Sequence, residues 1–232
     1  MVFYPSQMIH YHGTPITPRK ALLEMAGRHF CISFADPRDI DECLRIGQSL
    51  MLDNGAFTAF TKGKPMDVDG YIRWCDQHLA HPHWAVVPDV IDGNEDQQRL
   101  EIDKWPFPKE LSAPVWHLGL SLDWLLELSD NWPRVCFGST SAYWKIGSPS
   151  WVRRMNEAFD ALMSRRKHLP WIHGMRMLDQ NDGPWPLASA DSTNVARNHK
   201  EFRFGPDVMA ARIDAKQPAK KWQGSSQLEL IT

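Results

Sequence analysis

Residues 188–198 read ASADSTNVARN, a run of small residues that ends on Asp191 and leads into a segment of helical composition. A strand that only had to end could finish on Gly, Asn or Pro, so a carboxylate at this point needs an explanation. In barrels and open parallel sheets, the carboxyl ends of the strands form the functional face. The stretch therefore predicts a strand whose end carries chemistry, provided that the rest of the chain repeats the pattern.

The same pattern recurs along the whole chain. Short β-rich runs alternate with longer stretches of helical periodicity, which is typical of βαβ units. The eight strand candidates are residues 8–13, 29–36, 49–55, 84–90, 113–119, 134–140, 171–176 and 186–192. Eight such units predict a (β/α)₈ TIM barrel. A doubly wound open sheet is the alternative, because the count rests on short runs whose boundaries can move.

Helices are expected between the strands, at residues 18–26, 37–46, 68–80, 94–104, 122–130 and 149–167. The last begins with Ser148 as a candidate N-cap and Pro149 at the first helical position. The connection LDQNDGPWP (178–186) is short and rich in Pro and Gly, so we expect the barrel to be irregular between its seventh and eighth strands. We expect one catalytic domain over 1–211, with a short helix after Asp191, and a polar C-terminal tail over 212–232.

Composition narrows the class of protein. The chain has 232 residues, 43% hydrophobic and 23% charged, as in soluble globular proteins. Its four cysteines form no CxxC pair, which argues against a structural zinc site and a secreted disulfide framework.

We see neither a signal peptide nor a membrane span, so we expect a cytoplasmic protein with no membrane partner. With a formal net charge of −2, local basic groups must hold any nucleic acid.

Almost every expected strand ends in a polar residue beside a small one. Asp and Gly commonly form turns at strand ends, but their repetition favours a polar pocket. Neighbouring buried carboxylates acquire different pKa values and can divide the roles of nucleophile and acid or base. These strand-end residues are His12, Gly13, Asp36, Asp53, Asn54, Gly55, Asp89, His117, Gly119, Gly138, Ser139, His173, Gly174, Arg176, Asp191 and Ser192.

Other motifs are weaker. His10 and His12 share one strand face, which is compatible with a metal pair but more often reflects polar packing or a substrate contact. We find no GxGxxG motif, no P-loop and no Ser-His-Asp order, and we expect no metal or cofactor. The eleven tryptophans either line a cleft or pack in the core and at the barrel ends, and packing is the commoner role.

Five segments together resemble the tRNA-guanine transglycosylases, and more closely the shortened phage and bacterial DpdA-like relatives that insert 7-deazaguanines into DNA. The likeness covers roughly residues 49–200. The segment LDNGAF (52–57) stands where the family has Asp-Ser-Gly-Gly-Phe after a strand, and ASADSTNVARN is similar to the segment that carries the family's nucleophilic aspartate. The other three segments are VVPDVIDG (86–93), FGSTS (137–141) and HGMR (173–176).

The resemblance implies base exchange at a nucleoside in guanine-containing DNA, with a free 7-deazaguanine as the second substrate. Asp191 would attack the anomeric carbon, Asp53 would act as the general acid/base, and Asp89 would accept hydrogen bonds from the purine. Whether the protein forms a homodimer, or binds a partner protein of the phage or its host, is left open by the sequence. The remaining residues expected to contact the base are Asn54, Gly55, Phe57, His117, Gly138, Ser139, His173, Gly174 and Arg176.

Two departures from the family pattern are informative. Asn54 and Ala56 replace the usual Ser and second Gly, so the family pattern does not fix the details of the base contacts. The RNA enzymes carry a cysteine-rich zinc insertion after the last strand, whereas no cysteine lies beyond Cys136 here. The lack of that RNA clamp favours DNA, or another nucleic-acid form, over a tRNA stem-loop.

A base within a duplex must be extruded before a pocket can take it, so we expect backbone contacts from loops on the catalytic side. Trp144 or Trp151 is available for stacking on bases. The alternative functions are a nucleoside or nucleotide N-glycosidase, a tRNA-type base exchange, and a catalytically silent nucleic-acid-binding barrel. The basic groups expected at the backbone are Lys62, Lys64, Lys145, Arg197 and Lys200, with Lys216, Lys220 and Lys221 from the tail.

Overall fold

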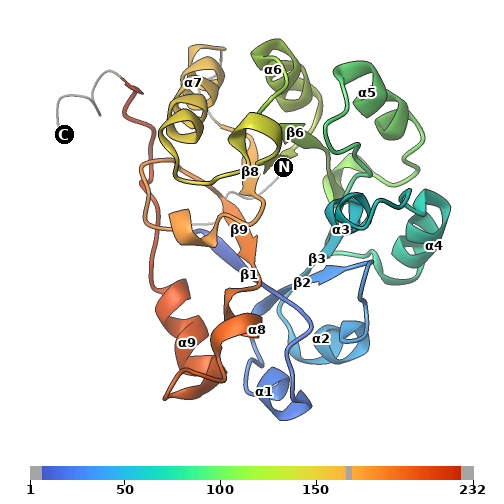
Figure 1. Ribbon diagram of the computed structural model, residues 1–232, viewed down its shortest axis with the longest axis vertical. Coiled ribbons are helices and arrows are strands. Elements are labelled where there is room, and N and C mark those ends of the chain that lie inside the picture. The colour runs from blue at the N-terminus through green and yellow to red at the C-terminus, as the bar shows by residue number, and fades with distance from the viewer. Residues whose placement is uncertain (1–6, 166–168, 226–232) are drawn as a thin grey trace.

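A computed structural model describes residues 7–165 and 169–225, and these form an α/β barrel of the TIM type (Figure 1). The strands are all parallel, in the order β5-β4-β3-β2-β1-β9-β8-β7-β6, and helices surround them. Each of the eight predicted strand regions contains a strand, so the expected fold is confirmed. The strands are β1 (Ile9–Gly13), β2 (His29–Ser33), β3 (Leu50–Asp53), β4 (Trp84–Val86), β5 (Ser112–Ala113), β6 (Val115–His117), β7 (Arg134–Gly138), β8 (Trp171–Gly174) and β9 (Ser189–Ser192).

The ninth strand arises because Pro114 divides the fifth predicted one. β5 pairs with β4, whereas β6 pairs with β7. Proline has no backbone N–H to donate, so the ladder is interrupted there. Its carbonyl still accepts a hydrogen bond from the backbone N–H of Cys136 at 2.9 Å. The segment from Ser112 to His117 thus bridges the two ends of the sheet, and the open-sheet alternative does not hold.

All six predicted helices are present in the described residues, although several are shorter than expected: α1 (Arg19–Leu23), α2 (Ile40–Ile46), α4 (Val68–His78), α5 (Glu95–Asp103), α6 (Leu122–Asn131) and α7 (Pro149–Arg165). Ser148 caps α7 by accepting a hydrogen bond from the Trp151 N–H. The predicted last two residues of that helix lie outside the described residues.

Two helices were not predicted, namely α3 (Ala56–Thr61) and α9 (Gly205–Asp214), while α8 (Asn194–Asn198) is the expected short helix after Asp191. Gly55 begins α3 with a φ of 77°, a left-handed conformation that suits glycine. The described residues also contain three 3₁₀ turns: η1 (Lys109–Leu111), η2 (Ser141–Tyr143) and η3 (Leu178–Gln180). The connection between β8 and β9 holds only η3, and this confirms the expected irregularity.

The expected start of the tail, residue 212, falls inside α9. Asp214 at the end of α9 accepts hydrogen bonds from His12 at 3.0 Å and from Arg28 at 2.6 Å. Further along, the indole N–H of Trp222 donates to Asp160 of α7 at 2.7 Å. The described part of the tail is therefore attached to the barrel by specific hydrogen bonds.

Side-chain alternation along the strands separates two apolar layers. The larger lies between the strands and the helices, and the smaller fills the barrel interior with Tyr11, Cys31, Met51, Trp84, Val86, Ala113, Val115 and Cys136. Most tryptophans serve packing, and nine of the described ones are buried: Trp74, Trp84, Trp105, Trp116, Trp124, Trp132, Trp151, Trp171 and Trp185.

The pair of histidines on β1 faces outward, because the alternate residue Tyr11 belongs to the interior cluster. His12 bonds to Asp214 of α9, and His10 lies 3.7 Å from the same carboxylate. Burial lowers the pKa of His10 to about 4. Among the described residues, no group of three or more His, Cys, Asp or Glu side chains has a geometry that could hold a metal ion. Polar packing is thus what the structure shows for this pair.

Candidate active site

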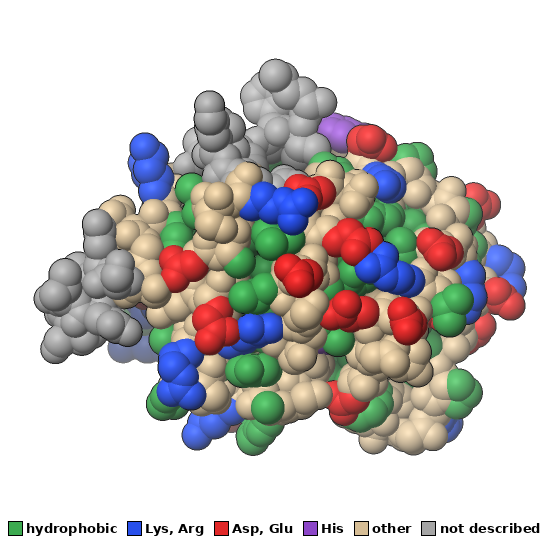
Figure 2. Space-filling model, turned by 90° about the horizontal axis from the view of Figure 1, so that it is seen from above, with side chains coloured by type: hydrophobic (Ala, Val, Ile, Leu, Met, Phe, Trp, Pro, Cys, Tyr) green, Lys and Arg blue, Asp and Glu red, His purple; other side chains and the backbone are tan. Residues whose placement is uncertain are grey.

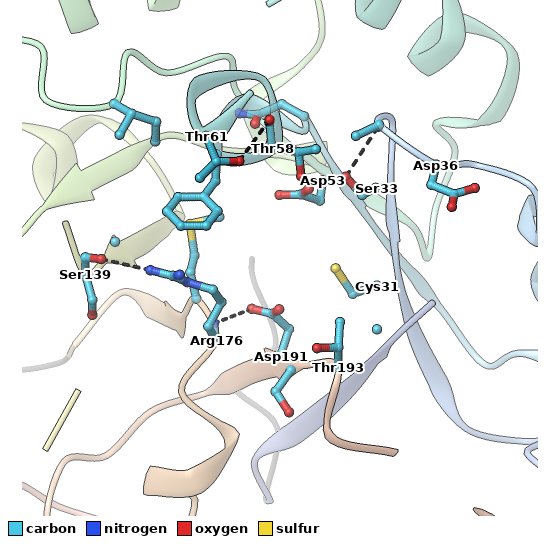
Figure 3. A pocket seen from close by; sticks show the side chains of 18 of the residues that line it. Cys31, Ser33, Asp36, Asp53, Thr58, Thr61, Ser139, Arg176, Asp191 and Thr193 are labelled. Atoms are coloured by element: carbon cyan, nitrogen blue, oxygen red, sulfur yellow. Dashed lines mark hydrogen bonds between the residues drawn. The ribbon is translucent and has the colours of Figure 1, made fainter. Parts of the chain in front are cut away.

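A cavity of about 760 Å³ opens at the carboxyl ends of the strands. Its volume lies within the range of roughly 300–1,000 Å³ that is usual for small-molecule sites. Residues from strands far apart in the sequence line it, together with α3 and α8 (Figure 3). This is the end of a TIM barrel where enzymes of this fold carry their chemistry.

Asp53 and Asp191 both line this cavity, as the sequence predicts. Asp53 is the last residue of β3, in register with Ser33 of β2, whereas Asp191 lies in β9, in register with Tyr11 of β1. Figure 3 shows the two carboxylates facing one hollow, with Cys31 between them. Two carboxylates separated by 138 positions in the chain thus share one site.

The electrostatics of Asp53 suit an acid/base group. Burial raises its pKa to about 6, and the negative charges of Asp191 and Asp89 contribute to that rise. The Ser33 hydroxyl and the Gly55 N–H, which donates to Oδ2 of Asp53 at 3.2 Å, oppose it. A carboxyl group that titrates near pH 6 can both donate and accept a proton around neutral pH.

Asp191 is held through one of its two oxygens. Oδ1 accepts a hydrogen bond from the backbone N–H of Arg176 at 2.8 Å and lies 3.2 Å from Nε2 of His173. No donor from the described residues bonds to Oδ2. The side chain of Asp191 retains 12% of its exposure, enough for a ligand in the cavity to reach it. One oxygen of Asp191 is thus held by two protein groups, and the other faces no hydrogen-bond donor among the described residues.

Asp89, in the segment after β4, anchors a hydrogen-bonded group on the wall formed by the ends of β3, β4, β6 and β7. Its Oδ1 accepts from the Asn54 side-chain amide at 2.7 Å, and its Oδ2 lies 2.9 Å from Nε2 of His117. Nδ1 of His117 in turn lies 3.3 Å from the Thr140 hydroxyl. A Cβ at Gly138 would come within 2.9 Å of the His117 ring, so glycine is needed there to admit the imidazole. Carboxylate oxygens have further lone pairs, so Asp89 can still accept from a ligand.

Arg176 crosses the cavity from the end of β8. Its guanidinium lies 4.3 Å from the ring centroid of Phe57 and donates to the Ser139 carbonyl at 2.9 Å (Figure 3). Arg176 also has a φ of 59°, which is unusual for a residue with a side chain. Phe57 is 43% exposed, so together they form an aromatic and cationic wall at the mouth.

The structure brings most of the predicted base-contact residues to the cavity, with three exceptions. The predicted residues that line it are Asn54, Phe57, Asp89, His117, Gly138, Ser139 and Arg176. Gly55 instead begins α3, and His173 is fully buried behind Asp191. A Cβ at Gly174 would meet Met177 and Leu187 rather than the cavity. These three residues support the site without lining it.

Of the basic residues predicted to contact the nucleic-acid backbone, some line the cavity and others do not. Lys62 and Arg197 line the cavity, whereas Lys64 lines a smaller cavity of about 290 Å³ on the far side of α3. Lys145 and Lys200 are exposed and line neither cavity. Of the two tryptophans considered for stacking, Trp151 is completely buried and donates to Ser139, whereas Trp144 is 70% exposed.

Several lining residues were not predicted, among them Cys31, Ser33, Thr58, Thr61, Thr140 and Asn194. Cys31 and Ser33 alternate on β2, so the inward face of the predicted strand 29–36 contained the signal. Thr58 and Thr61 belong to α3, which was itself missed.

The charged side chains on the face seen in Figure 2 give that face no preference for an anionic partner. Figure 2 shows Lys and Arg side chains interspersed with Asp and Glu on one face of the molecule. No helix among the described residues has the length and apolar character to cross a bilayer.

No protein-family model matches the sequence, and no curated protein matches it either.

Proposed function

We propose that this protein is a DNA guanine transglycosylase that exchanges guanine for a 7-deazaguanine base. The observation that carries the proposal is the pair Asp53 and Asp191 on one cavity, the former with a pKa of about 6 and the latter with one unbonded oxygen. The sequence resemblance gives the pair its roles, and the geometry is compatible with them.

In the first half-reaction, Oδ2 of Asp191 attacks C1′ of a deoxyguanosine. The C1′–N9 bond breaks, and guanine leaves with that electron pair while protonated Asp53 supplies a proton. A covalent sugar ester on Asp191 results, so one hard substitution is divided into two easier ones. In the second half-reaction, Asp53 takes the N9 proton of the incoming 7-deazaguanine. Its N9 then displaces Asp191 from C1′, and both carboxyl groups return to their starting state.

Recognition of the base would fall to the wall around Asp89. A carboxylate only accepts hydrogen bonds, and the amino and ring N–H groups on one edge of guanine only donate. Phe57 and Arg176 offer a flat surface against which a purine can stack. Because the cavity lies at the barrel mouth, the target nucleotide must be single-stranded or extruded from the duplex.

The proposal is tested by incubating the full chain with guanine-containing DNA and radiolabelled guanine. Incorporation of label supports base exchange, and competition by an unlabelled 7-deazaguanine identifies the second substrate. Release of guanine without incorporation would instead indicate an N-glycosidase. Retention of DNA without any chemistry would indicate a binding protein, and incorporation into tRNA alone would indicate tRNA-type exchange. Each of these last three results contradicts the proposal.

A further inference from the structure

A buried row of polar side chains runs along the inside of the barrel towards the cavity and ends at Asp191. The indole N–H of Trp171 donates to the Ser189 hydroxyl at 2.7 Å, and that hydroxyl lies 2.8 Å from Nδ1 of His173. Nε2 of His173 then lies 3.2 Å from Oδ1 of Asp191. Ser189 and His173 are completely buried. We refer to Trp171, Ser189, His173 and Asp191 as the relay.

The strand register explains why the relay forms. Ser189 and Asp191 are alternate residues of β9, so both point into the barrel. His173 of the neighbouring strand β8 is in register with Ser189. Two strands thus supply a continuous path inside the barrel, where no solvent competes for the hydrogen bonds.

The direction of the hydrogen bonds in the relay follows from the first donor. An indole nitrogen can only donate, so the Ser189 oxygen accepts from Trp171. The serine hydroxyl has one proton, and among the described residues Nδ1 of His173 is the remaining partner of that hydroxyl. The buried hydroxyl proton needs an acceptor, and Nδ1 is the acceptor within reach among the described residues, so Ser189 donates to Nδ1 and the imidazole proton lies on Nε2, facing Asp191.

We propose that the relay fixes His173 as the neutral Nε2–H tautomer and thereby makes it a positioning residue for Asp191. Oδ1 of Asp191 then receives two donors, the imidazole N–H and the Arg176 backbone N–H, and Oδ2 is directed to the cavity as the reacting oxygen. The tautomer is a statement about the folded protein alone. Its effect on rate rests on the proposed base exchange.

The tautomer is tested directly on the full chain without substrate. In a ¹⁵N-histidine-labelled sample at pH 7, long-range proton–nitrogen spectra distinguish imidazoles protonated at Nε2, at Nδ1 or at both. The signal of His173 is assigned by its loss in His173→Gln. We expect the pure Nε2–H form. An Nδ1–H form or a doubly protonated ring would overturn the proposal.

Two matched variants distinguish the effect of breaking the relay from the effect of losing any buried hydroxyl group. Ser189→Ala removes the acceptor of the Trp171 N–H, and Tyr11→Phe removes the acceptor of the Trp84 N–H at an equally buried position in the same barrel. We expect Ser189→Ala to give a mixture of tautomers and Tyr11→Phe to leave the wild-type spectrum. An unchanged spectrum in Ser189→Ala would refute the relay.

The kinetic consequence is measured with the base-exchange assay. Ser189→Ala should lower kcat at least about tenfold with little change in KM, because the loss is of orientation rather than of binding. His173→Gln retains a donor near the position of Nε2 and should keep more activity than His173→Leu. Equal kcat in these two variants would contradict the positioning role. If wild-type exchange is absent while the tautomer is as expected, only the proposed function fails.

Discussion

Nε2 of His117 lies 2.9 Å from Oδ2 of Asp89, and both side chains are about 95% buried. The contact joins the end of β6 to the segment after β4, and the Asn54 amide bonds to the other carboxylate oxygen. Each oxygen of Asp89 therefore already has a protein donor, which fixes the plane of the carboxylate against the cavity. A ligand meets an acceptor that is oriented before it binds.

Replacing Asp89 with Asn should weaken base binding. One amide NH₂ would then face either the Asn54 amide or the His117 ring, and the acceptor offered to the purine would be lost. We expect the KM for the incoming base to rise about 10- to 100-fold, in line with about 1.5–3 kcal/mol for a hydrogen bond to a charged group. Steady-state exchange kinetics check this. If KM rose for the DNA substrate but not for the incoming base, Asp89 would not be the residue that recognises the free base.

Replacing Asp191 with Ala should lower the rate of base exchange at least about a thousandfold, because the nucleophile is removed. The folded structure should persist. His173 and the Arg176 N–H lose their acceptor, which costs about 1–3 kcal/mol in the free energy of unfolding. Labelled-base incorporation and circular dichroism check the two effects. Wild-type turnover in this variant would remove Asp191 from the mechanism.

The stability of the protein should depend on the ionisation of Asp53. Its pKa is about 6 in the folded state, compared with an ordinary value of 3.8. Between these values the folded state binds more protons than the unfolded state, so stability falls as the pH rises through this window. The fall should be at most about 3 kcal/mol. Urea unfolding of the wild type and of Asp53→Asn checks this, since the variant should lose that part of the pH dependence.

Asp36 provides the control for this experiment, because its pKa is shifted the other way. The Arg38 guanidinium, which bonds to it at 2.7 Å and 2.6 Å, lowers the pKa of Asp36. Asp36→Asn should therefore leave the fall in stability between pH 4 and pH 6 in place. The same loss of pH dependence in both variants would show that Asp53 is not its source.

The left-handed backbone of Arg176 predicts a difference between two truncations. Arg176→Gly and Arg176→Ala both remove the guanidinium and its contacts with Phe57 and Ser139, but only glycine adopts a φ of 59° without strain. The Gly variant should be more stable than the Ala variant by about 1 kcal/mol. Thermal unfolding of the two proteins checks this. Equal stability would mean that the backbone relaxes once the arginine is gone.

DNA binding should depend on the two basic residues that line the cavity. Neutralising a phosphate contact reduces the salt dependence of binding by about one unit of the logarithmic slope. Lys62→Ala and Arg197→Ala should each show this reduction, whereas Lys145→Ala and Lys200→Ala, which change exposed residues outside the cavity, should not. Fluorescence anisotropy with a labelled oligonucleotide at several salt concentrations checks the four variants. A flat salt response of the wild type would favour a free nucleoside substrate.

Local patterns made much of the fold predictable. A period of two in short runs and a period near four between them predict strands and helices, because side-chain direction repeats with the backbone geometry. All eight strand regions and six helices followed from this. Helices α3 and α9 were not predicted. Helix α3 is only six residues long, which is too short for a periodic pattern to show. The sequence of α9 has no clear apolar periodicity, so it could not be told apart from a polar tail.

The sequence by itself determined that polar residues stand at the ends of parallel strands, and so that Asp53 and Asp191 approach one mouth. Tertiary structure alone decided which way each strand faces. His10 and His12 share a face in any strand, but only packing against α9 and the interior position of Tyr11 turn that face outward. In the same way, the depth of His173 in the barrel, set by its register with Ser189, makes it a support for Asp191 rather than a wall of the cavity. Register and inward direction depend on contacts between segments far apart in the chain, and these contacts leave no mark in a local pattern.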